Sequence, residues 1–392
     1  MIRMLDVVLA TWGAATSAAW CAGNLTSLHQ TRRLRHLRDV AADPPASWPR
    51  LSVVIAACNE ATTLALASAS LLAVDYPDLE VVLVDDRSTD GTGVLVDRIA
   101  AGDPRVQPVH ISQLPEGWLG KVHALEVGAA TATGEWLLFT DADVHFEPAA
   151  LRRAVALCVA EEIDHLVVMP DVESRTILEE AVIDAVGDRF LRKTRAARIG
   201  EPGCDAYAGI GAFNLVRRAA LERSEGFSWL RMEVVDDVGL GLLLRRAGAR
   251  SAFVLGDGAV QLRWYSSMGD MARGFEKNLF GFIAHYRWHR VAGLALGTVA
   301  MALGPLVALV AGPAWVRGLG AAALATLLVT AAILARRTGR RLLPMLLLPV
   351  GHLVLVALVV RSALACGRHR GIVWRGTLYP LAVLRAEQRV RL

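Results

Sequence analysis

The stretch Trp136-Leu137-Leu138-Phe139-Thr140-Asp141-Ala142-Asp143 decides the fold, because an apolar run typical of a buried strand leads directly into two carboxylates. Side chains alternate along an extended chain, so Asp141 and Asp143 are expected to point to the same side. Carboxylate oxygens arranged in this way suit a hard divalent cation such as Mg²⁺ or Mn²⁺. The stretch therefore predicts a strand that ends in a cation site.

Strand and helix patterns alternate on both sides of this stretch. Short apolar runs predict strands at residues 51–57, 79–84, 106–111, 136–140, 165–169, 212–216 and 252–255. Helical patterns separate them at residues 61–73, 94–101, 121–132, 152–161, 177–193 and 238–247. Strands separated by helices of this length predict an α/β domain with a mostly parallel sheet.

Polar clusters follow three of the predicted strands, namely Asn59-Glu60, Asp85-Asp86 and the pair at Asp141 and Asp143. Parallel sheets bind ligands at the carboxyl ends of their strands, so these clusters are expected to share one edge. A cation held there would carry the phosphates of a nucleotide. The alternatives are local: Asn59 could cap the following helix, and Asp90 fits a turn residue.

A second acidic pair, Asp236-Asp237, stands at the start of the predicted helix 238–247. These carboxylates could supply a base that the cation does not use. Carboxylates at a helix start are also favoured by the helix dipole, so capping is the alternative for one of them.

The excess apolar content lies in long blocks without charged residues. The hydrophobic fraction is 54% and the mean hydropathy is +0.39. The blocks are residues 7–28, 291–316, 318–335 and 342–360. Each is near or above the roughly 18–20 residues that cross a bilayer. We predict an N-terminal anchor at 1–28 and up to three spans in 291–366.

The orientation follows from the arginines near these blocks. Arg32, Arg33, Arg35 and Arg38 follow the first block, which places that side in the cytoplasm and favours an uncleaved anchor over a signal peptide. The catalytic domain would then be cytosolic, on an inner or plasma membrane. The basic loop at 336–341 and the basic tail 367–392 cannot both be cytoplasmic if the last block spans the membrane fully. Either that block re-enters, or the tail is an exception to the positive-inside rule.

Two connecting segments complete the expected organisation. Residues 29–50 are basic and proline-rich and predict a linker. Residues 266–290 have apolar residues at helical spacing, which predicts an amphipathic helix on the membrane surface or one packed on the catalytic domain. The net charge of +4 and the absence of an aromatic-plus-basic module argue against nucleic acid, and the scattered cysteines predict neither a zinc site nor a disulfide framework.

The motifs together resemble the family 2 glycosyltransferases of GT-A architecture over residues 51–265. The resemblance is carried, in order, by residues 53–60, 84–92, Gly120-Lys121, 140–143 and Asp236-Asp237 with the helix ending at Gly248. The Trp118-Leu119-Gly120-Lys121 stretch and the flanking spans look most like the membrane-bound branch that acts on carotenoid, hopanoid or other lipid acceptors.

The resemblance implies a role for each matched residue at the donor. Asp86 would bind the uridine base or ribose, and Asn59 and Glu60 would line the nucleotide pocket. Lys121 would lie near the donor diphosphate, with a solvated surface lysine as the alternative. Asp143 would bind Mg²⁺ or Mn²⁺, and Asp141 would contact the ribose or a metal-bound water.

The resemblance also implies the chemistry. Asp237 would be the general base that deprotonates an acceptor hydroxyl, with Asp236 in the place where the family commonly has glutamate. The processive members' Gln-x-x-Arg-Trp motif is one residue short here, at Gln261-Leu262-Arg263-Trp264, which favours transfer of a single sugar.

The expected function is therefore inverting transfer of one sugar from a nucleotide sugar, with UDP as the expected nucleotide, to a lipid or membrane-held hydroxyl. A polyprenyl-phosphate glycosyltransferase, a nucleotidyltransferase and a non-catalytic membrane scaffold that retains the fold are the alternatives. The nucleotidyltransferase is disfavoured because no glycine-rich phosphate loop follows the first strand. The sequence does not indicate an oligomeric state.

Overall fold

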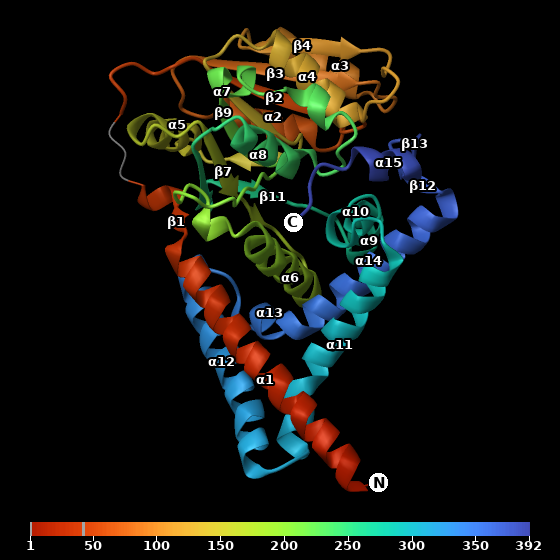
Figure 1. Cartoon of the computed structure of the whole chain (residues 1–392). Helices are drawn as coiled ribbons and strands as arrows, with labels where there is room; N and C mark the ends of the chain where they lie inside the picture. The colour runs from red at the N-terminus through yellow and green to blue at the C-terminus, as the bar shows by residue number, and fades with distance from the viewer. Residues whose placement is uncertain (1, 41–43) are drawn as a thin grey trace. The chain divides into compact units, whose positions relative to one another are not determined.

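The computed structural model describes residues 2–40 and 44–392, with side chains from residue 4 onward. The chain divides into two compact units (Figure 1). A helical unit comprises residues 1–33, 174–193 and 265–372, and an α/β unit comprises residues 34–173, 194–264 and 373–392. Both units are therefore built from segments that are distant in the sequence.

The α/β unit is built on an eight-stranded sheet with the order β1-β10-β7-β9-β5-β2-β3-β4. β9 runs antiparallel to β5 and β7, whereas the other neighbouring strands are parallel. The predicted α/β class with a mostly parallel sheet is thus confirmed. The strands are β1 (Arg35–His36), β2 (Leu51–Ala57), β3 (Leu79–Asp86), β4 (Val106–Ile111), β5 (Trp136–Thr140), β7 (His165–Met169), β9 (Asn214–Arg217) and β10 (Ser251–Leu255).

Helices connect these strands. They are α2 (Leu64–Leu72), α3 (Thr92–Gly102), α4 (Gly120–Thr131), α5 (Ala150–Ala160), α7 (Arg218–Glu222), α8 (Asp236–Arg246) and α15 (Leu381–Glu387). α4 packs against both β2 and β3. This packing brings the start of α4 to the edge of the sheet where the polar clusters were expected.

Several short strands have too few residues to produce a periodic signal. β6 (Val144–Phe146), β11 (Val260–Leu262) and β8 (Asp171–Val172) form a three-stranded sheet, and β12 (Gly371–Trp374) pairs with β13 (Thr377–Pro380). β1 lies inside the segment that was expected to be a linker, and it pairs with β10. The buried side chain of His36 in β1 also bonds to Asp257, which follows β10.

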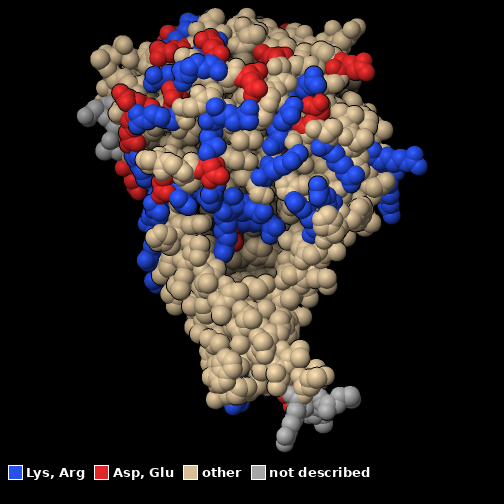
Figure 2. Space-filling view, viewed as in Figure 1, with Lys and Arg blue, Asp and Glu red and all other residues tan. Residues whose placement is uncertain are grey.

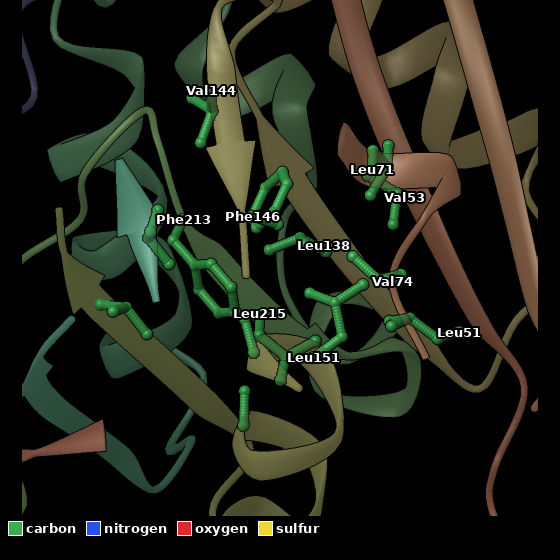
Figure 3. Packing of buried hydrophobic residues seen from close by; sticks show 14 of the residues in the cluster. Leu51, Val53, Leu71, Val74, Leu138, Val144, Phe146, Leu151, Phe213 and Leu215 are labelled. Atoms are coloured by element: carbon green, nitrogen blue, oxygen red, sulfur yellow. The ribbon is translucent and has the colours of Figure 1, made fainter. Parts of the chain in front are cut away.

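The core of the α/β unit lies against the sheet (Figure 3). Leu138 of β5 is fully buried and packs with Val53 of β2 and Leu215 of β9 in one cluster. Phe146 and Phe213 lie in the same cluster with their ring centroids 6.2 Å apart. The apolar residues that predicted β2 and β5 are therefore the residues that fix these strands.

The helical unit contains three helices that are long and apolar enough to cross a membrane, within the part of the chain that is described. These are α11 (Trp288–Val310), α12 (Ala314–Thr338) and α14 (Leu348–His369). The remaining helices are α1 (Ile2–Arg33), α6 (Ile177–Thr194), α9 (Met268–Phe275), α10 (Leu279–Ala284) and α13 (Leu342–Leu346). α1 is not among the three, so the N-terminal anchor at 1–28 stays a prediction.

α1 nevertheless packs along both α11 and α12. Trp20 Nε1 donates a hydrogen bond to the Met301 carbonyl at 2.6 Å, and Asn24 Nδ2 donates to Thr326 Oγ1 at 3.2 Å. Side-chain bonds between apolar helices satisfy polar groups that lipid cannot. α1 is thus an integral part of the helical unit.

The segment expected to be one amphipathic helix is divided into α9 and α10. α10 ends at Ala284, where His285 and Tyr286 adopt positive φ angles of 50° and 57°. Both helices contact α14, and Phe275 and Leu279 are buried. The apolar residues of α9 and α10 therefore pack against α14 within the helical unit.

We expect Leu138→Ala to lower the free energy of unfolding by about 2–5 kcal/mol, because it leaves a cavity in the core. Leu66→Ala on α2 is the matched control, because Leu66 is 70% exposed. The control should change stability by no more than about 0.5 kcal/mol. Thermal unfolding in detergent measures both, and equal losses would contradict the assignment of the core.

Candidate active site

The loops that follow β2 and β3 are tied together by side chains from both. The Asn59 N–H donates to Ser88 Oγ at 3.0 Å, and Asn59 Oδ1 accepts from the Thr89 N–H at 2.8 Å. Asp90 accepts from the Ala61 N–H at 3.1 Å and from its own turn at Thr92. Asn59 does not cap α2, whose first turn is preceded by Thr63. Asn59 and Asp90 thus fix the shape of the loops, and nucleotide binding by Asn59 and Glu60 stays a prediction.

Asp86 ends β3 and is 3% exposed. Its two oxygens accept from Arg87 Nε at 2.7 Å and from Arg87 Nη2 at 3.0 Å, a bidentate arrangement that holds both side chains. Gly120 lies directly against this pair, because a Cβ at Gly120 would collide with both the carboxylate and the guanidinium. The glycine before Lys121 therefore allows α4 to begin beside Asp86.

Lys121 extends from the first turn of α4 into a group of carboxylates. Its Nζ lies 2.7 Å from Asp141 Oδ1 and 3.4 Å from Asp236 Oδ2. Burial alone would lower the pKa of Lys121, but the charges of Asp141, Asp236 and Asp237 outweigh it and raise that pKa. Lys121 is therefore a permanent cation that joins the end of β5 to the start of α8, and not a solvated surface lysine.

Asp237 lies in the first turn of α8 with both oxygens oriented by backbone groups. Oδ2 accepts from the Gly211 N–H at 2.9 Å, and Oδ1 accepts from the Val238 N–H at 2.8 Å. Burial and the neighbouring charge of Asp236 raise the pKa of Asp237, although Lys121 opposes the shift. An oriented carboxylate with a raised pKa has the properties of a general base that operates near neutral pH.

Asp141 and Asp143 lie in the turn between β5 and β6, outside the extended strand on which their expected shared side was based. Burial, together with the charges of Asp141 and Glu60, raises the pKa of Asp143. Within the described part of the chain, no group of three or more His, Cys, Asp or Glu side chains is arranged to hold a metal. Mg²⁺ is commonly bound by one or two carboxylates plus substrate phosphates, so concentrated negative charge at Asp143 still fits a cation that arrives with a nucleotide.

A cavity that is open to solvent lies beside these groups, and its empty space of about 250 Å³ includes part of that solvent. Its lining combines the charged cluster with the ends of β5 and α8: Lys121, Leu125, Phe139, Thr140, Asp141, Gly211, Asn214, Asp236, Asp237 and Leu240. The predicted site residues Asn59, Glu60, Asp86 and Asp143 are not part of this lining. The cavity is therefore suited to a small group held between Lys121 and Asp237.

The structure brings most of the predicted site residues together. Lys121, Asp141, Asp236 and Asp237 line one cavity, and the charge of Glu60 reaches Asp143. Asp86 joins them through its contact with Gly120. Sequence reasoning missed Arg87, although it directly follows Asp86 in the quoted motif. It also missed Gly211, Glu233 and the C-terminal residues that reach this site, for which no local pattern gave a signal.

Comparison with known proteins identifies the fold of this chain. Residues 52–224 match the model of Glycosyl transferase family 2. A mannosyltransferase of Pyrobaculum calidifontis, solved in complex with GDP-Man and Mn²⁺, superposes with a TM-score of 0.55 and 23% identity over 91% of this chain and 98% of that chain. The chain thus has the GT-A fold, and residues 52–224 are similar to glycosyltransferase family 2.

Curated relatives match over shorter stretches. The beta-monoglucosyldiacylglycerol synthase of Synechocystis is 26% identical over 252 residues, which is 59% of this chain and 49% of that protein. The succinoglycan biosynthesis protein ExoO of Rhizobium meliloti is 36% identical over 115 residues, covering 29% of this chain and 31% of that protein. The chain therefore spans between a third and a half of the length of such relatives.

We expect Gly120→Ala to destabilise the α/β unit by about 1–3 kcal/mol, because the added methyl group must displace Asp86 or Arg87. Gly102→Ala at the end of α3 is the control, because a Cβ there meets nothing within 4 Å. The control should leave the unfolding temperature unchanged or raise it slightly. If Gly120→Ala were as stable as the control, the close approach of α4 to Asp86 would be wrong.

Proposed function

We propose that this protein is a membrane-associated, inverting glycosyltransferase that moves one sugar from a nucleoside-diphosphate sugar to a lipid hydroxyl. The donor nucleotide is UDP in this proposal. The observation that carries the proposal is the cavity in which Lys121 and the oriented carboxylate of Asp237 face the same space. In this arrangement the cation can stabilise the departing diphosphate, and the base can accept the proton of the attacking hydroxyl.

Asp237 acts as the general base. Its carboxylate accepts the proton of the acceptor hydroxyl as the oxygen attacks the anomeric carbon, and the bond from that carbon to the diphosphate oxygen breaks. A single displacement inverts the anomeric configuration, so an α-linked donor gives a β-glycoside. Asp236 is buried and lies 3.4 Å from Lys121, so its role is to position Lys121 and to raise the basicity of Asp237.

Asp143, with Asp141 beside it, would hold Mg²⁺ or Mn²⁺. When bound, the metal supplies positive charge that neutralises the departing nucleoside diphosphate. Lys121 adds a second positive charge at the start of α4, where the helix dipole also favours phosphate. Asp141 accepts from Lys121 Nζ at 2.7 Å, which holds the ammonium group at the end of β5.

A lipid acceptor is supported by the helical unit. α11 exposes Leu296, Val299, Leu303, Leu306 and Val310, which would face hydrocarbon in a bilayer. The surface in Figure 2 that corresponds to α1, α11 and α12 in Figure 1 shows few charged side chains. The names of the Synechocystis relative and of an undecaprenol-linked glucosyltransferase of Campylobacter jejuni also describe lipid acceptors.

The main alternative is transfer to a polyprenyl phosphate. A phosphate acceptor is already an anion and needs no strong base, so the two reactions differ in their dependence on Asp237. The oriented, half-buried carboxylate of Asp237 favours the hydroxyl acceptor.

We expect Asp237→Asn to lower the turnover number by about 10²–10⁴-fold while nucleotide binding is retained, because the amide cannot accept the proton. The assay uses purified protein in detergent with a panel of UDP- and GDP-sugars, Mn²⁺ and a membrane lipid extract, and it reads nucleotide release with and without the lipid. Undiminished transfer to a polyprenyl phosphate by the variant would support the alternative. Absence of lipid-dependent release by the wild-type protein with every donor would refute the proposal.

We expect Lys121→Gln to shift the acid limb of the pH–rate profile to higher pH by about one unit. The base must be deprotonated, so activity is lost as the pH falls through the raised pKa of Asp237. Lys121 lowers that pKa, and its removal therefore raises it further. Lys121→Arg keeps the charge and should keep the wild-type limb; an unshifted limb in Lys121→Gln would contradict the coupling.

A further inference from the structure

The last twenty residues of the chain, 373–392, belong to the α/β unit and are called the C-terminal segment here. They contain the end of the β12–β13 hairpin and α15, shown in blue in Figure 1. In the sequence this stretch indicates only a basic tail. In the structure it contacts residues on two sides of the candidate active site.

The hairpin reaches the residues expected to bind the donor nucleotide. Arg375 forms an ion pair with Glu60, and its Nη1 donates to the Asn59 carbonyl at 3.4 Å. The hydroxyl of Tyr379 accepts from the Gly120 N–H at 3.4 Å, and Tyr379 is 6% exposed. The hairpin therefore lies beside the start of α4, where backbone N–H groups and the helix dipole favour phosphate.

The end of the segment is anchored beside the catalytic base. Glu233 is 2% exposed, and its Oε2 accepts from the Arg389 N–H at 2.7 Å and the Val390 N–H at 2.9 Å. Its Oε1 accepts from the Val235 N–H at 3.3 Å, directly before Asp236. The Arg389 guanidinium also stacks on Trp229, with its carbon 5.3 Å from the ring centroid. This anchoring gives the hairpin a fixed position.

The charge balance of the site calls for a further cation. Glu60, Asp86, Asp141, Asp143, Asp236 and Asp237 bring six potential negative charges, and a nucleoside diphosphate adds more. Lys121 is committed to Asp141 and Asp236, and Arg87 is committed to Asp86. Arg375 is also paired, but its side chain remains 41% exposed, so a ligand can reach the guanidinium.

We propose that Arg375, held in place by the C-terminal segment, is a donor-binding residue that contacts the diphosphate of the nucleotide sugar. Arginine is well suited to this contact, because its guanidinium presents several donors to phosphate oxygens and stays charged. The ion pair with Glu60 holds the guanidinium beside the loop that follows β2. This inference rests on the proposed function and adds a binding residue from outside residues 52–224.

The experiment compares affinities for UDP and uridine, in the presence of Mn²⁺, by calorimetry on the full-length protein in detergent. Arg375→Gln is expected to weaken UDP binding about tenfold or more, because a charge-assisted hydrogen bond to the diphosphate is lost. Uridine binding should be unchanged, because uridine has no diphosphate. Arg375→Lys should recover part of the loss. Arg391→Gln removes an equal charge from the same segment at an exposed side chain and should bind UDP like the wild type.

Arg375 could also act indirectly, by neutralising Glu60. The double variant Glu60→Gln with Arg375→Gln separates the two, because a purely indirect role predicts that it binds UDP as tightly as Glu60→Gln alone. The proposal expects weaker binding by the double variant, and equal binding would overturn it. Equal losses for UDP and uridine would overturn it as well, since they indicate a structural role.

The outcome for the wild-type protein separates this inference from the proposed function. Where the wild type binds GDP in preference to UDP, the same comparison is made with GDP and guanosine. Wild-type binding that is insensitive to Arg375→Gln overturns only the role of Arg375. A wild-type protein that binds neither nucleoside diphosphate overturns both the donor class and the role of Arg375.

Discussion

The interaction on which the site depends is the placement of one partly buried ammonium group among carboxylates from separate elements. Lys121 from α4 reaches Asp141 at the end of β5 and Asp236 at the start of α8. Without this cation, the partly desolvated carboxylates would repel each other. Their neutral, protonated forms would then be favoured over the ionised forms. Gly120 makes the placement possible, because only a residue without a side chain lets α4 begin against Asp86.

The regular part of the fold could be predicted because its signals are local. β2, β5 and β7 have the predicted bounds, since each is an apolar run that is almost wholly buried. β4 also has the predicted bounds, although it is an edge strand in which only Val106 and Ile111 are buried. β1, β8 and β11 could not be found, because two or three residues carry no periodicity and are ordered by pairing with distant strands.

The candidate site was predictable to a similar extent. Asp141, Asp143, Asp236 and Asp237 stand at element ends, where pattern and resemblance both point to them. The bond from Asp237 to the Gly211 N–H and the ion pair from Arg375 to Glu60 depend on long-range packing, for which the chain gives no local signal. The catalytic domain was also expected to end near residue 265, yet residues 373–392 return to it.

The discontinuity of the two units limits how this protein can be dissected. α6 lies between β8 and β9 in the chain, but it belongs to the helical unit, where Ala181, Val182 and Ala185 are fully buried and Arg341 pairs with Glu180. Excising residues 34–264 as a water-soluble enzyme would strip this helix of its partners and leave an apolar face open to aggregation. Detergent-solubilised full-length material is consequently the natural starting point for biochemistry.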